Sequence, residues 1–378
     1  MQRVRVRVGA RRADYEIIIG ASVLSTLGAQ SRRALNPRAR RIALISNPKV
    51  FKLYGPRVVE SLRNADFKVS HWLMNDGERH KTFRTLERAL AFLSATGLER
   101  SDAVVALGGG VVGDLAGCAA ALYLRGVDFI QAPTTLLAQI DASVGGKTGV
   151  NTAAGKNLVG AFHQPRAVLI DTHTLQTLPA RELTAGWCEA VKQGAAGDRK
   201  LFDETCGFLQ SQKAGETTPP GLERLIAAQC AFKAAIVSND EREDVSRTDA
   251  RSRRILNFGH TTAHALELIT GYRRFRHGEA VGYGMLVAGE ISERLGMLGL
   301  SELELLRAAV RACGRLPHAD DLDPEQIAHS FTHDKKSVGG HLKWILLERL
   351  GRAAIVDSSE IAAKLLRASI VAALRTQT

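Results

Sequence analysis

The chain has 378 residues, of which 45% are hydrophobic and 24% charged, and its formal net charge is +12. This length accommodates two domains with substantial cores, and the composition is ordinary for a globular enzyme. Because no run approaches the ~18 apolar residues of a membrane span, and because basic residues are spread among acids with only 5% aromatics, we expect neither membrane nor nucleic-acid partners. A locally positive site for an anionic small substrate explains the charge better.

The first residues, Met1–Ala10, alternate basic and apolar side chains. This alternation predicts an N-terminal strand with one solvated face and lacks the apolar core of a signal peptide. The cysteines are dispersed without a CxxC pair, which indicates reduced, buried thiols: Cys118, Cys188, Cys206, Cys230 and Cys313. We therefore expect a cytoplasmic protein.

Strands and helices alternate through the first half of the chain. The apolar runs predict strands at Glu16–Ile19, Arg41–Ser46, Phe67–Trp72, Ala103–Leu107, Asp128–Gln131 and Ala167–Asp171. Helical periods lie between them at Leu53–Asn64, Thr82–Thr96 and Leu115–Tyr123. Such alternation predicts a mostly parallel sheet, so we assign an α/β, Rossmann-like nucleotide-binding domain to residues 1–175.

Helical periods dominate the second half. The clearest helices are predicted at Arg199–Leu209, Gly221–Asn239, Thr261–Thr270, Ala280–Leu295, Ser301–Cys313 and Ser358–Leu374. A surface linker is expected at Lys213–Pro220, and a small hairpin at Lys343–Leu347 and Arg352–Val356. We expect a mainly helical domain over residues 176–378, with the site between the two domains.

A glycine turn follows the strand Ala103–Leu107. Gly108, Gly109 and Gly110 come directly after it, and Asp114 is expected to open the next helix. A strand, a glycine turn and a helix N-terminus expose backbone N–H groups to a pyrophosphate. The spacing to Gly113 fits the dinucleotide fingerprint, although a plain tight turn remains an alternative. The turn comes after the fourth or fifth strand, so the domain is a variant of the standard Rossmann arrangement.

Hydroxyl and lysine side chains gather in the next thirty residues. Thr134 and Thr135 follow a strand, and Lys147 and Lys156 each follow glycine. Each lysine alone is compatible with a solvated loop, but together they favour a phosphate-holding site.

The second half contains a candidate metal site. His260 and His264 are four residues apart on one helix, so their rings lie on the same face. His277 follows shortly, and Glu189 lies on another helix. Three histidines and a carboxylate suit a catalytic zinc site. Spacing alone favours His260 and His264 as the ligand pair.

These motifs resemble the 3-dehydroquinate synthase family, the NAD-using, metal-dependent cyclases of the shikimate pathway. The resemblance is carried by GGGVVGDLAG, RGVDFIQAPTTLLAQIDASVGGKTGVN and GKNLVGAFHQP. It continues through DGERHK, LPARELTAGWCEAVKQG, LNFGHTTAHALE, HGEAV and HDKK, in the order of the family. It implies a Rossmann-like domain followed by a helical metal and substrate domain.

The resemblance also implies roles for individual residues. It assigns zinc or cobalt to Glu189, His260 and His277, and turns His264 toward the substrate. It places NAD on the glycine turn and its neighbours: Asp76, Gly77, Glu78, Arg79, His80, Lys81, Gly110, Val111, Val112, Gly113, Asp114, Thr134, Thr135, Lys147, Lys156, Thr174, Leu175, Gln176 and Thr177.

Substrate-binding residues follow in the same way. Phosphate is assigned to Lys147, Asn257, His264 and either Lys335 or Lys336, with Arg125 from a neighbouring subunit of a homodimer. The carboxylate is assigned to Lys233 and Arg253, because a guanidinium binds a carboxylate bidentately. The hydroxyls near the metal are assigned to Asp141, Asn157, Lys192 and Glu243.

The implied reaction converts 3-deoxy-D-arabino-heptulosonate 7-phosphate to 3-dehydroquinate and phosphate. Transient oxidation by NAD, elimination of phosphate, re-reduction and an intramolecular aldol follow one another without net redox change. The cofactor is therefore expected to be recycled.

The chain departs from the family pattern at three places. Ala142 replaces a serine, Thr262 and Ala263 replace a bulky residue and a glycine, and Glu241–Arg254 is longer than usual. The longer segment leaves Arg247, Arg251 and Arg254 as alternatives to Arg253. Two other functions remain open: a related sugar-phosphate cyclase, or a metal-dependent polyol dehydrogenase that would release NADH.

Overall fold

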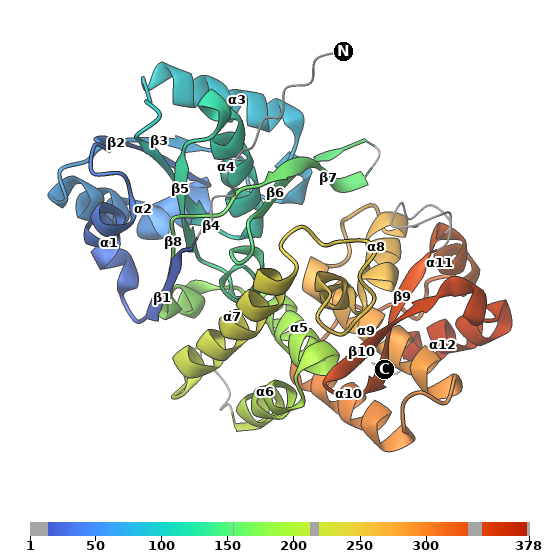
Figure 1. Cartoon of the computed structure of the whole chain (residues 1–378). Helices are drawn as coiled ribbons and strands as arrows, with labels where there is room; N and C mark the ends of the chain where they lie inside the picture. Colours follow the sequence, from blue (N-terminus) through green and yellow to red (C-terminus); the bar gives the residue numbers. More distant parts are fainter. Residues whose placement is uncertain (1–13, 154, 212–218, 332–341, 376–378) are drawn as a thin grey trace, which may run out of the picture.

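The computed structural model describes residues 14–153, 155–211, 219–331 and 342–375 (Figure 1). The predicted strand at Met1–Ala10, most of the predicted linker and the HDKK motif lie outside these residues. The first half contains a six-stranded sheet with the order β1-β8-β5-β4-β2-β3, and every neighbouring pair is parallel. Its strands are β1 (Glu16–Gly20), β2 (Arg41–Ser46), β3 (Lys68–Leu73), β4 (Ala103–Gly108), β5 (Asp128–Pro133) and β8 (Ala167–Asp171).

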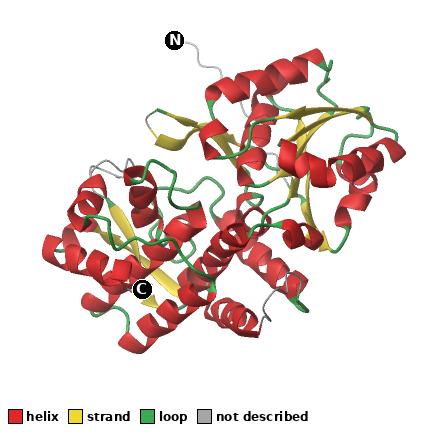
Figure 2. Ribbon diagram, turned by 180° about the vertical axis from the view of Figure 1, so that it is seen from behind, coloured by secondary structure: helices red, strands yellow, loops and turns green. Residues whose placement is uncertain are grey.

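Helices cover both faces of this sheet (Figure 2). The helices α1 (Leu27–Ala34) and α2 (Pro48–Asn64) pack on one face, and α3 (Phe83–Ala95) and α4 (Gly110–Leu122) pack on the other. The side chain of Asn47 caps α2 by accepting a hydrogen bond from Val50 N at 2.8 Å. The α/β, Rossmann-like prediction for this half is confirmed.

One sequence prediction in this half needs correction, and one pair of strands was not predicted. The helix after the glycine turn begins at Gly110 and not at Asp114, because a helix N-terminus tolerates glycine better than helix propensity alone indicates. The segment around Lys147 and Lys156, for which no strand was predicted, forms the antiparallel hairpin β6 (Lys147–Thr152) and β7 (Gly155–Phe162). Glycine hides this strand signal, since it is rare in strands, yet close pairing requires it: a Cβ on Gly160 would lie 1.9 Å from Thr148 O.

The second half is mainly helical, as predicted. Its helices are α5 (Ala180–Gly197), α6 (Arg199–Ser211), α7 (Leu222–Asn239), α8 (His260–Ile269), α9 (His277–Arg294), α10 (Leu300–Ala312), α11 (Pro324–Ser330) and α12 (Ala363–Arg375). The predicted hairpin is present as antiparallel β9 (Lys343–Arg349) and β10 (Arg352–Asp357). The short α11 was not expected from the sequence.

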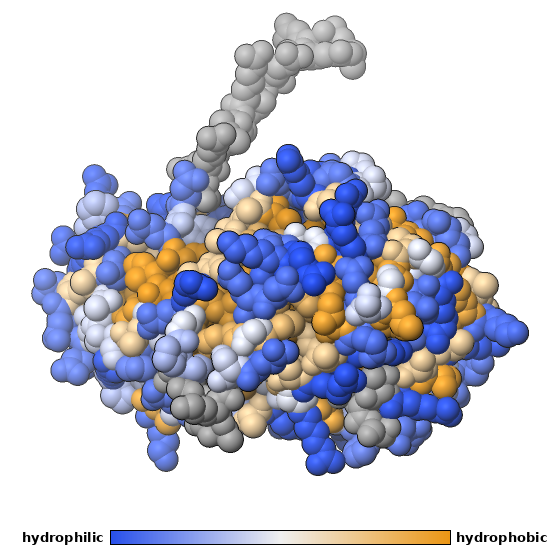
Figure 3. Space-filling view, turned by 90° about the horizontal axis from the view of Figure 1, so that it is seen from below, coloured by the Kyte–Doolittle hydropathy of each residue, from blue (hydrophilic) through white to orange (hydrophobic). Residues whose placement is uncertain are grey.

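One buried core joins the two halves. Val168 and Ile170 of β8 belong to the same hydrophobic cluster as Trp187 of α5 and Ile291 of α9. The sheet and the helical half are therefore held in a fixed relation, which positions the groups described below. Hydrophilic and hydrophobic residues are interspersed on the face seen in Figure 3. No helix within the described residues has the length and apolar character needed to cross a membrane.

Candidate active site

The segments singled out in the sequence meet at the carboxyl edge of the parallel sheet. The glycine turn follows β4, Thr134 and Thr135 follow β5, and the short helix Thr172–Thr177 follows β8. The hairpin β6–β7 leaves the same edge and reaches toward α8 (Figure 1). Open α/β sheets bind their ligands at this edge.

A candidate metal site lies on the helical side of this edge. Glu189 of α5, His260 at the start of α8 and His277 at the start of α9 each offer one ligand atom, and these atoms lie within 4.8 Å of one another. Nε2 of His277 is 3.5 Å from Oε1 of Glu189, and Nε2 of His260 is 4.0 Å from the same oxygen. The group that the resemblance implied is brought together, and His264 is not part of it.

The surroundings of the Glu189 carboxylate favour a bound cation. Its carboxylate is fully buried, and no hydrogen bond from the described residues reaches its Oε1. A buried carboxylate oxygen without a donor is unfavourable unless a cation neutralises it. Lys192 Nζ lies 2.7 Å from the other oxygen, Oε2. Two imidazoles and one carboxylate form a donor set that suits zinc or cobalt.

Close helix packing fixes these three side chains. A Cβ on Gly278 would lie 1.9 Å from Ala185 O, so glycine lets the first turn of α9 cross directly over α5. Gly259, which precedes His260, has a φ of 78° and lies against α9. The left-handed conformation favours glycine there. The glycines in FGH and HGE thus set the relative positions of His260, His277 and Glu189.

One further residue of this site, Glu267 of α8, was not predicted from the sequence. Its Oε2 lies 3.4 Å from Nδ1 of His277, and its Oε1 accepts a hydrogen bond from Lys156 Nζ at 2.9 Å. Burial opposes ionisation, but His277 and Lys156 lower the pKa of Glu267 to about 2. A carboxylate behind a metal-binding imidazole orients the ring. The spacing from His260 through His264 to Glu267, i, i+4 and i+7, is a signal that could have found it.

Lys156 also links the two halves of the chain. It lies on β7, and its ammonium group is 4.6 Å from the centre of the Tyr272 ring in addition to its ion pair with Glu267. The hairpin from the sheet half is therefore attached to the helix that carries His260 and His264.

Asp141 lies between two buried lysines. Lys233 of α7 donates to the carboxylate of Asp141. Burial alone would raise the pKa of Asp141, but Lys233 and Lys192 outweigh it and hold that pKa well below its usual range. Burial lowers the pKa of Lys233 despite the Asp141 carboxylate. The predicted residues Asp141, Lys192 and Lys233 thus form one network beside Glu189.

A second network joins Glu243, Lys147 and Asn257. The carboxylate of Glu243 accepts hydrogen bonds from Lys147 Nζ and, at 2.7 Å, from Asn257 Nδ2. Glu243 has a φ of 55°, a conformation that is unfavourable for a residue with a side chain. Lys147 remains about half exposed at 47%, so its ammonium group is accessible to a ligand.

Burial distinguishes the four arginines that the sequence left open. Arg253 is 2% exposed and donates to Gly145 O at 3.0 Å and to Glu241 O at 2.6 Å. Burial lowers the pKa of Arg253. The positive charge of Arg253 also helps to lower the pKa of Lys233, because two nearby cations repel each other. Arg247 instead pairs with Asp249, Arg251 is exposed, and Arg254 donates to Val245 O.

The glycine turn forms a narrow backbone surface. A Cβ on Gly109 would lie 3.0 Å from Thr135 Cγ2, and a Cβ on Gly110 would lie 3.2 Å from the Cβ of Ala142. Side chains at these positions would fill the space beside the N-terminus of α4, where Val111, Val112 and Gly113 follow in the first turn. This arrangement fits a pyrophosphate held by backbone N–H groups.

Polar residues continue the cofactor side of the site. Lys81 is buried and pairs with Asp114 at 2.6 Å, and Glu78 accepts from Asn151 Nδ2 at 2.7 Å. Oγ1 of Thr134 is buried and has no partner among the described residues, so it can bond to a ligand. Thr174 accepts from Gln139 at 3.0 Å, and Tyr54 OH bonds to Thr177.

Some predicted site residues lie elsewhere. Arg125 is exposed beyond the C-terminal end of α4, the end opposite to Gly110. Arg79 and His80 line a separate cavity with Trp72. Lys335 and Lys336 lie outside the described residues.

Comparison with known families matches two models to this chain. The model described as 3-dehydroquinate synthase N-terminal matches residues 71–185, and that described as 3-dehydroquinate synthase C-terminal matches residues 186–337. The chain belongs to the 3-dehydroquinate synthase family. The family resemblance noted in the sequence is confirmed. The boundary predicted near residue 175 stays a prediction, and the last strand of the sheet ends shortly before it at Asp171.

Individual relatives agree with this assignment. A 3-dehydroquinate synthase of Pelotomaculum thermopropionicum is 44% identical over 94% of this chain and 93% of its own length. Among solved structures, this chain is similar to ValA, a 2-epi-5-epi-valiolone synthase of Streptomyces hygroscopicus subsp. jinggangensis with NAD+ and Zn2+ bound. The TM-score is 0.85 at 27% identity, and the match covers 97% of this chain and 99% of that chain. A 2-deoxy-scyllo-inosose synthase complexed with carbaglucose-6-phosphate, NAD+ and Co2+ has a TM-score of 0.80 at 27% identity, covering 94% and 96%.

Proposed function

We propose that this family member is a 3-dehydroquinate synthase, a lyase that converts 3-deoxy-D-arabino-heptulosonate 7-phosphate to 3-dehydroquinate and phosphate. The observation that carries the proposal is the Glu189–His260–His277 group, with its buried carboxylate, next to Asp141, Lys192 and Lys233. Support also comes from relatives of that name at about 40–44% identity over most of the chain.

Two bound groups belong to this function. We assign a divalent metal, zinc or cobalt, to Glu189, His260 and His277, and NAD to the glycine turn with Thr134, Thr135, Glu78 and Lys81. The donor set, the uncompensated Glu189 oxygen and the space beside Gly109 and Gly110 support these assignments. When bound, NAD supplies reversible hydride transfer and the metal lowers the pKa of a substrate hydroxyl.

The side chains of this chain position the substrate and neutralise its charge. Lys147 and Asn257 both donate hydrogen bonds to the carboxylate of Glu243. On substrate binding, they would donate to the substrate phosphate instead. Charge-assisted hydrogen bonds to phosphate are strong enough to favour such an exchange. Holding the phosphate in one orientation also favours its elimination, because the leaving group and the acidic C–H are then aligned.

The substrate carboxylate is assigned to Lys233 and Arg253. Both are buried cations beside Asp141, and burial lowers the pKa of each. A carboxylate placed between them would relieve this unfavourable burial of charge. A carboxylate is therefore expected to be required for good binding, which favours 3-deoxy-D-arabino-heptulosonate 7-phosphate over a sugar phosphate without one.

A direct comparison of two substrates tests the proposal. The zinc- and NAD-loaded protein is incubated with 3-deoxy-D-arabino-heptulosonate 7-phosphate or with glucose 6-phosphate, and the products are identified by mass spectrometry. We expect 3-dehydroquinate from the first and no carbocycle from the second. A carbocycle from glucose 6-phosphate alone would identify a related cyclase, such as the inosose synthase that shares this fold, and would refute the assignment.

Two further features complete the proposal. We infer a homodimer, because Arg125 lies far from the site of its own chain and would act only in a partner's site. We also infer a cytoplasmic location, since all five cysteines are free and four are buried. Sedimentation of the purified protein tests the first inference.

A further inference from the structure

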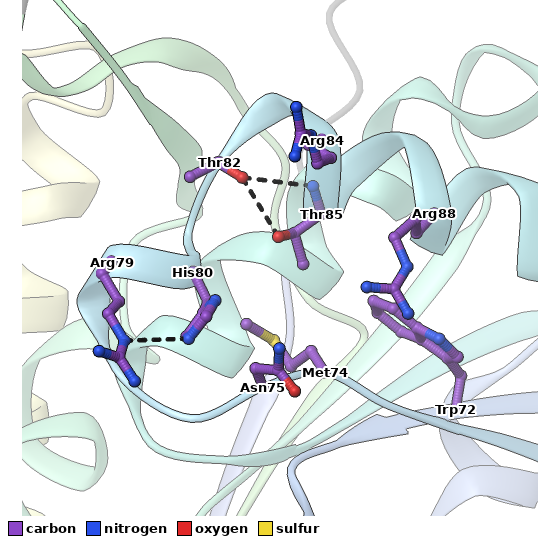
Figure 4. Close-up of a pocket in the computed structure, with 9 residues that line it drawn as sticks. All are labelled: Trp72, Met74, Asn75, Arg79, His80, Thr82, Arg84, Thr85 and Arg88. Atoms are coloured by element: carbon purple, nitrogen blue, oxygen red, sulfur yellow. Dashed lines mark hydrogen bonds between the residues drawn. The ribbon is translucent and has the colours of Figure 1, made fainter.

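A cavity of about 510 Å³ lies at the outer edge of the sheet, between the end of β3 and the start of α3 (Figure 4). Trp72 and Met74 provide its apolar side, Arg79, Arg84 and Arg88 provide cationic groups, and His80 adds a polar ring. Among the described residues that line this cavity, none is acidic.

The positive charge of this cavity is not compensated within the described part of the chain. No described carboxylate forms an ion pair with Arg79, Arg84 or Arg88. Instead, Arg79 Nε donates to His80 Nε2 at 3.1 Å, and the guanidinium of Arg88 lies 5.9 Å from the centre of the Trp72 ring.

A second arginine-rich cavity, of about 660 Å³, provides a contrast. It contains Arg38, Arg40, Arg41 and Arg100, but also Glu99 and Asp102. Arg41 pairs with Glu99 at 3.0 Å, and Asp102 accepts hydrogen bonds from the backbone N–H groups of Arg40, Arg41 and Glu99. Two carboxylates thus lie among its arginines, whereas no described carboxylate lines the cavity beside Trp72, where an anionic ligand would supply the negative charge.

The arrangement of the cations indicates the kind of ligand. In Figure 4, Arg79 and His80 lie on one side of the cavity and Arg84 and Arg88 on the other, with Met74 between them. Two separated cationic sides suit a molecule with an anionic group at each end, and the hydroxyls of Thr82 and Thr85 add neutral polar contacts. Guanidinium groups bind both phosphate and carboxylate well.

This cavity is distinct from the cofactor side of the same turn. Glu78 and Lys81 contact Asn151 and Asp114, and neither lines the cavity. Arg79 and His80 stand between them in sequence but face the cavity.

We propose that this cavity binds a small organic anion that carries a phosphate and a carboxylate, at the same time as NAD occupies the glycine turn. The proposal goes beyond the cyclase reaction and does not depend on it.

Fluorescence of Trp72 tests the proposal. The metal-loaded protein with saturating NAD+ is titrated with 3-phosphoglycerate in low salt, since salt screens such contacts. Trp187 and Trp344 are buried at 6% and 2% exposure, so we expect a saturable signal that is lost in Trp72→Phe. Arg84→Gln and Arg88→Gln should each weaken binding about tenfold or more, as loss of a hydrogen bond to a charged group does.

Arg38→Gln is the matched control, because it removes one charge from the second cavity. It should leave the affinity within about twofold of wild type, a difference small beside the tenfold loss expected for a charged contact. Circular dichroism and melting curves verify that each variant is folded. The proposal is refuted if no saturable signal appears, if Arg38→Gln weakens binding as much as Arg84→Gln, or if excess NAD+ displaces the anion. The last result would make the cavity part of the cofactor site.

Discussion

Replacement of Glu267 by glutamine tests how the metal site is supported. The variant Glu267→Gln keeps the size of the side chain but removes its charge. In the wild-type protein, Oε2 of Glu267 lies 3.4 Å from Nδ1 of His277, and Oε1 of Glu267 accepts a hydrogen bond from Lys156 Nζ at 2.9 Å. A neutral amide can no longer neutralise Lys156 and favour the tautomer of His277 that leaves Nε2 available to a metal.

The size of the effect follows from this geometry. Loss of a partner behind a metal-binding histidine typically weakens metal affinity about 10- to 100-fold, which corresponds to about 1.4–2.7 kcal/mol. The 3.4 Å contact to His277 is longer than the usual 2.9–3.0 Å. We therefore expect the lower end, about tenfold weaker zinc binding.

Zinc affinity is measured by competition with a chromophoric chelator, so the readout does not depend on turnover. Glu290→Gln is the matched control, because Glu290 is equally buried and pairs with Arg294 and Arg307. It lies about 20 Å from His277 along α9 at 1.5 Å per residue. Both variants should melt at lower temperature, but only Glu267→Gln should lose zinc affinity. Wild-type affinity in Glu267→Gln, or equal loss in both variants, would refute the supporting role of Glu267.

Three further predictions follow from the site. His277→Ala should lose its metal on dialysis, because two ligands remain of three; metal content equal to wild type by mass spectrometry would contradict this. Lys147→Ala should lower kcat about 100-fold, the usual effect of removing one charge-stabilising group, with NAD affinity in titration calorimetry largely kept; unchanged phosphate release would exclude Lys147 from the site. Arg253→Ala should abolish measurable turnover, whereas Arg251→Ala, at an exposed position, should keep it; the reverse pattern in phosphate-release assays would reassign the carboxylate.

Much of the fold could be predicted because burial leaves a local pattern. The strands Arg41–Ser46 and Ala167–Asp171 agree with β2 and β8 to the residue, since strands buried on both faces are apolar throughout. The hairpin β6–β7 was missed because its strands depend on pairing with each other and contain glycines at Gly149 and Gly160. Such pairing has no local signature.

The metal-binding residues could be predicted from the sequence, because histidines are few and metal binding is a specific role for them. Glu189, His260 and His277 lie on three helices, and spacing alone favoured His264 over His277. The family resemblance, and not the spacing, pointed to the group that the structure brings together. The sequence favoured Arg253 over three other arginines only by its distance to Asn257, and its burial could not be predicted because charge and residue type are the same for all four. Glu267 was missed because it acts through His277 and not on a ligand.

One assay tests directly whether the protein is a cyclase that recycles its cofactor. Phosphate release from 3-deoxy-D-arabino-heptulosonate 7-phosphate is followed together with absorbance at 340 nm, with NAD+ well below the substrate concentration. We expect phosphate to appear in amounts equal to the substrate consumed, with no net rise in NADH. Absence of phosphate from the metal-loaded protein, or steady accumulation of NADH with a polyol in place of the sugar phosphate, would contradict the account.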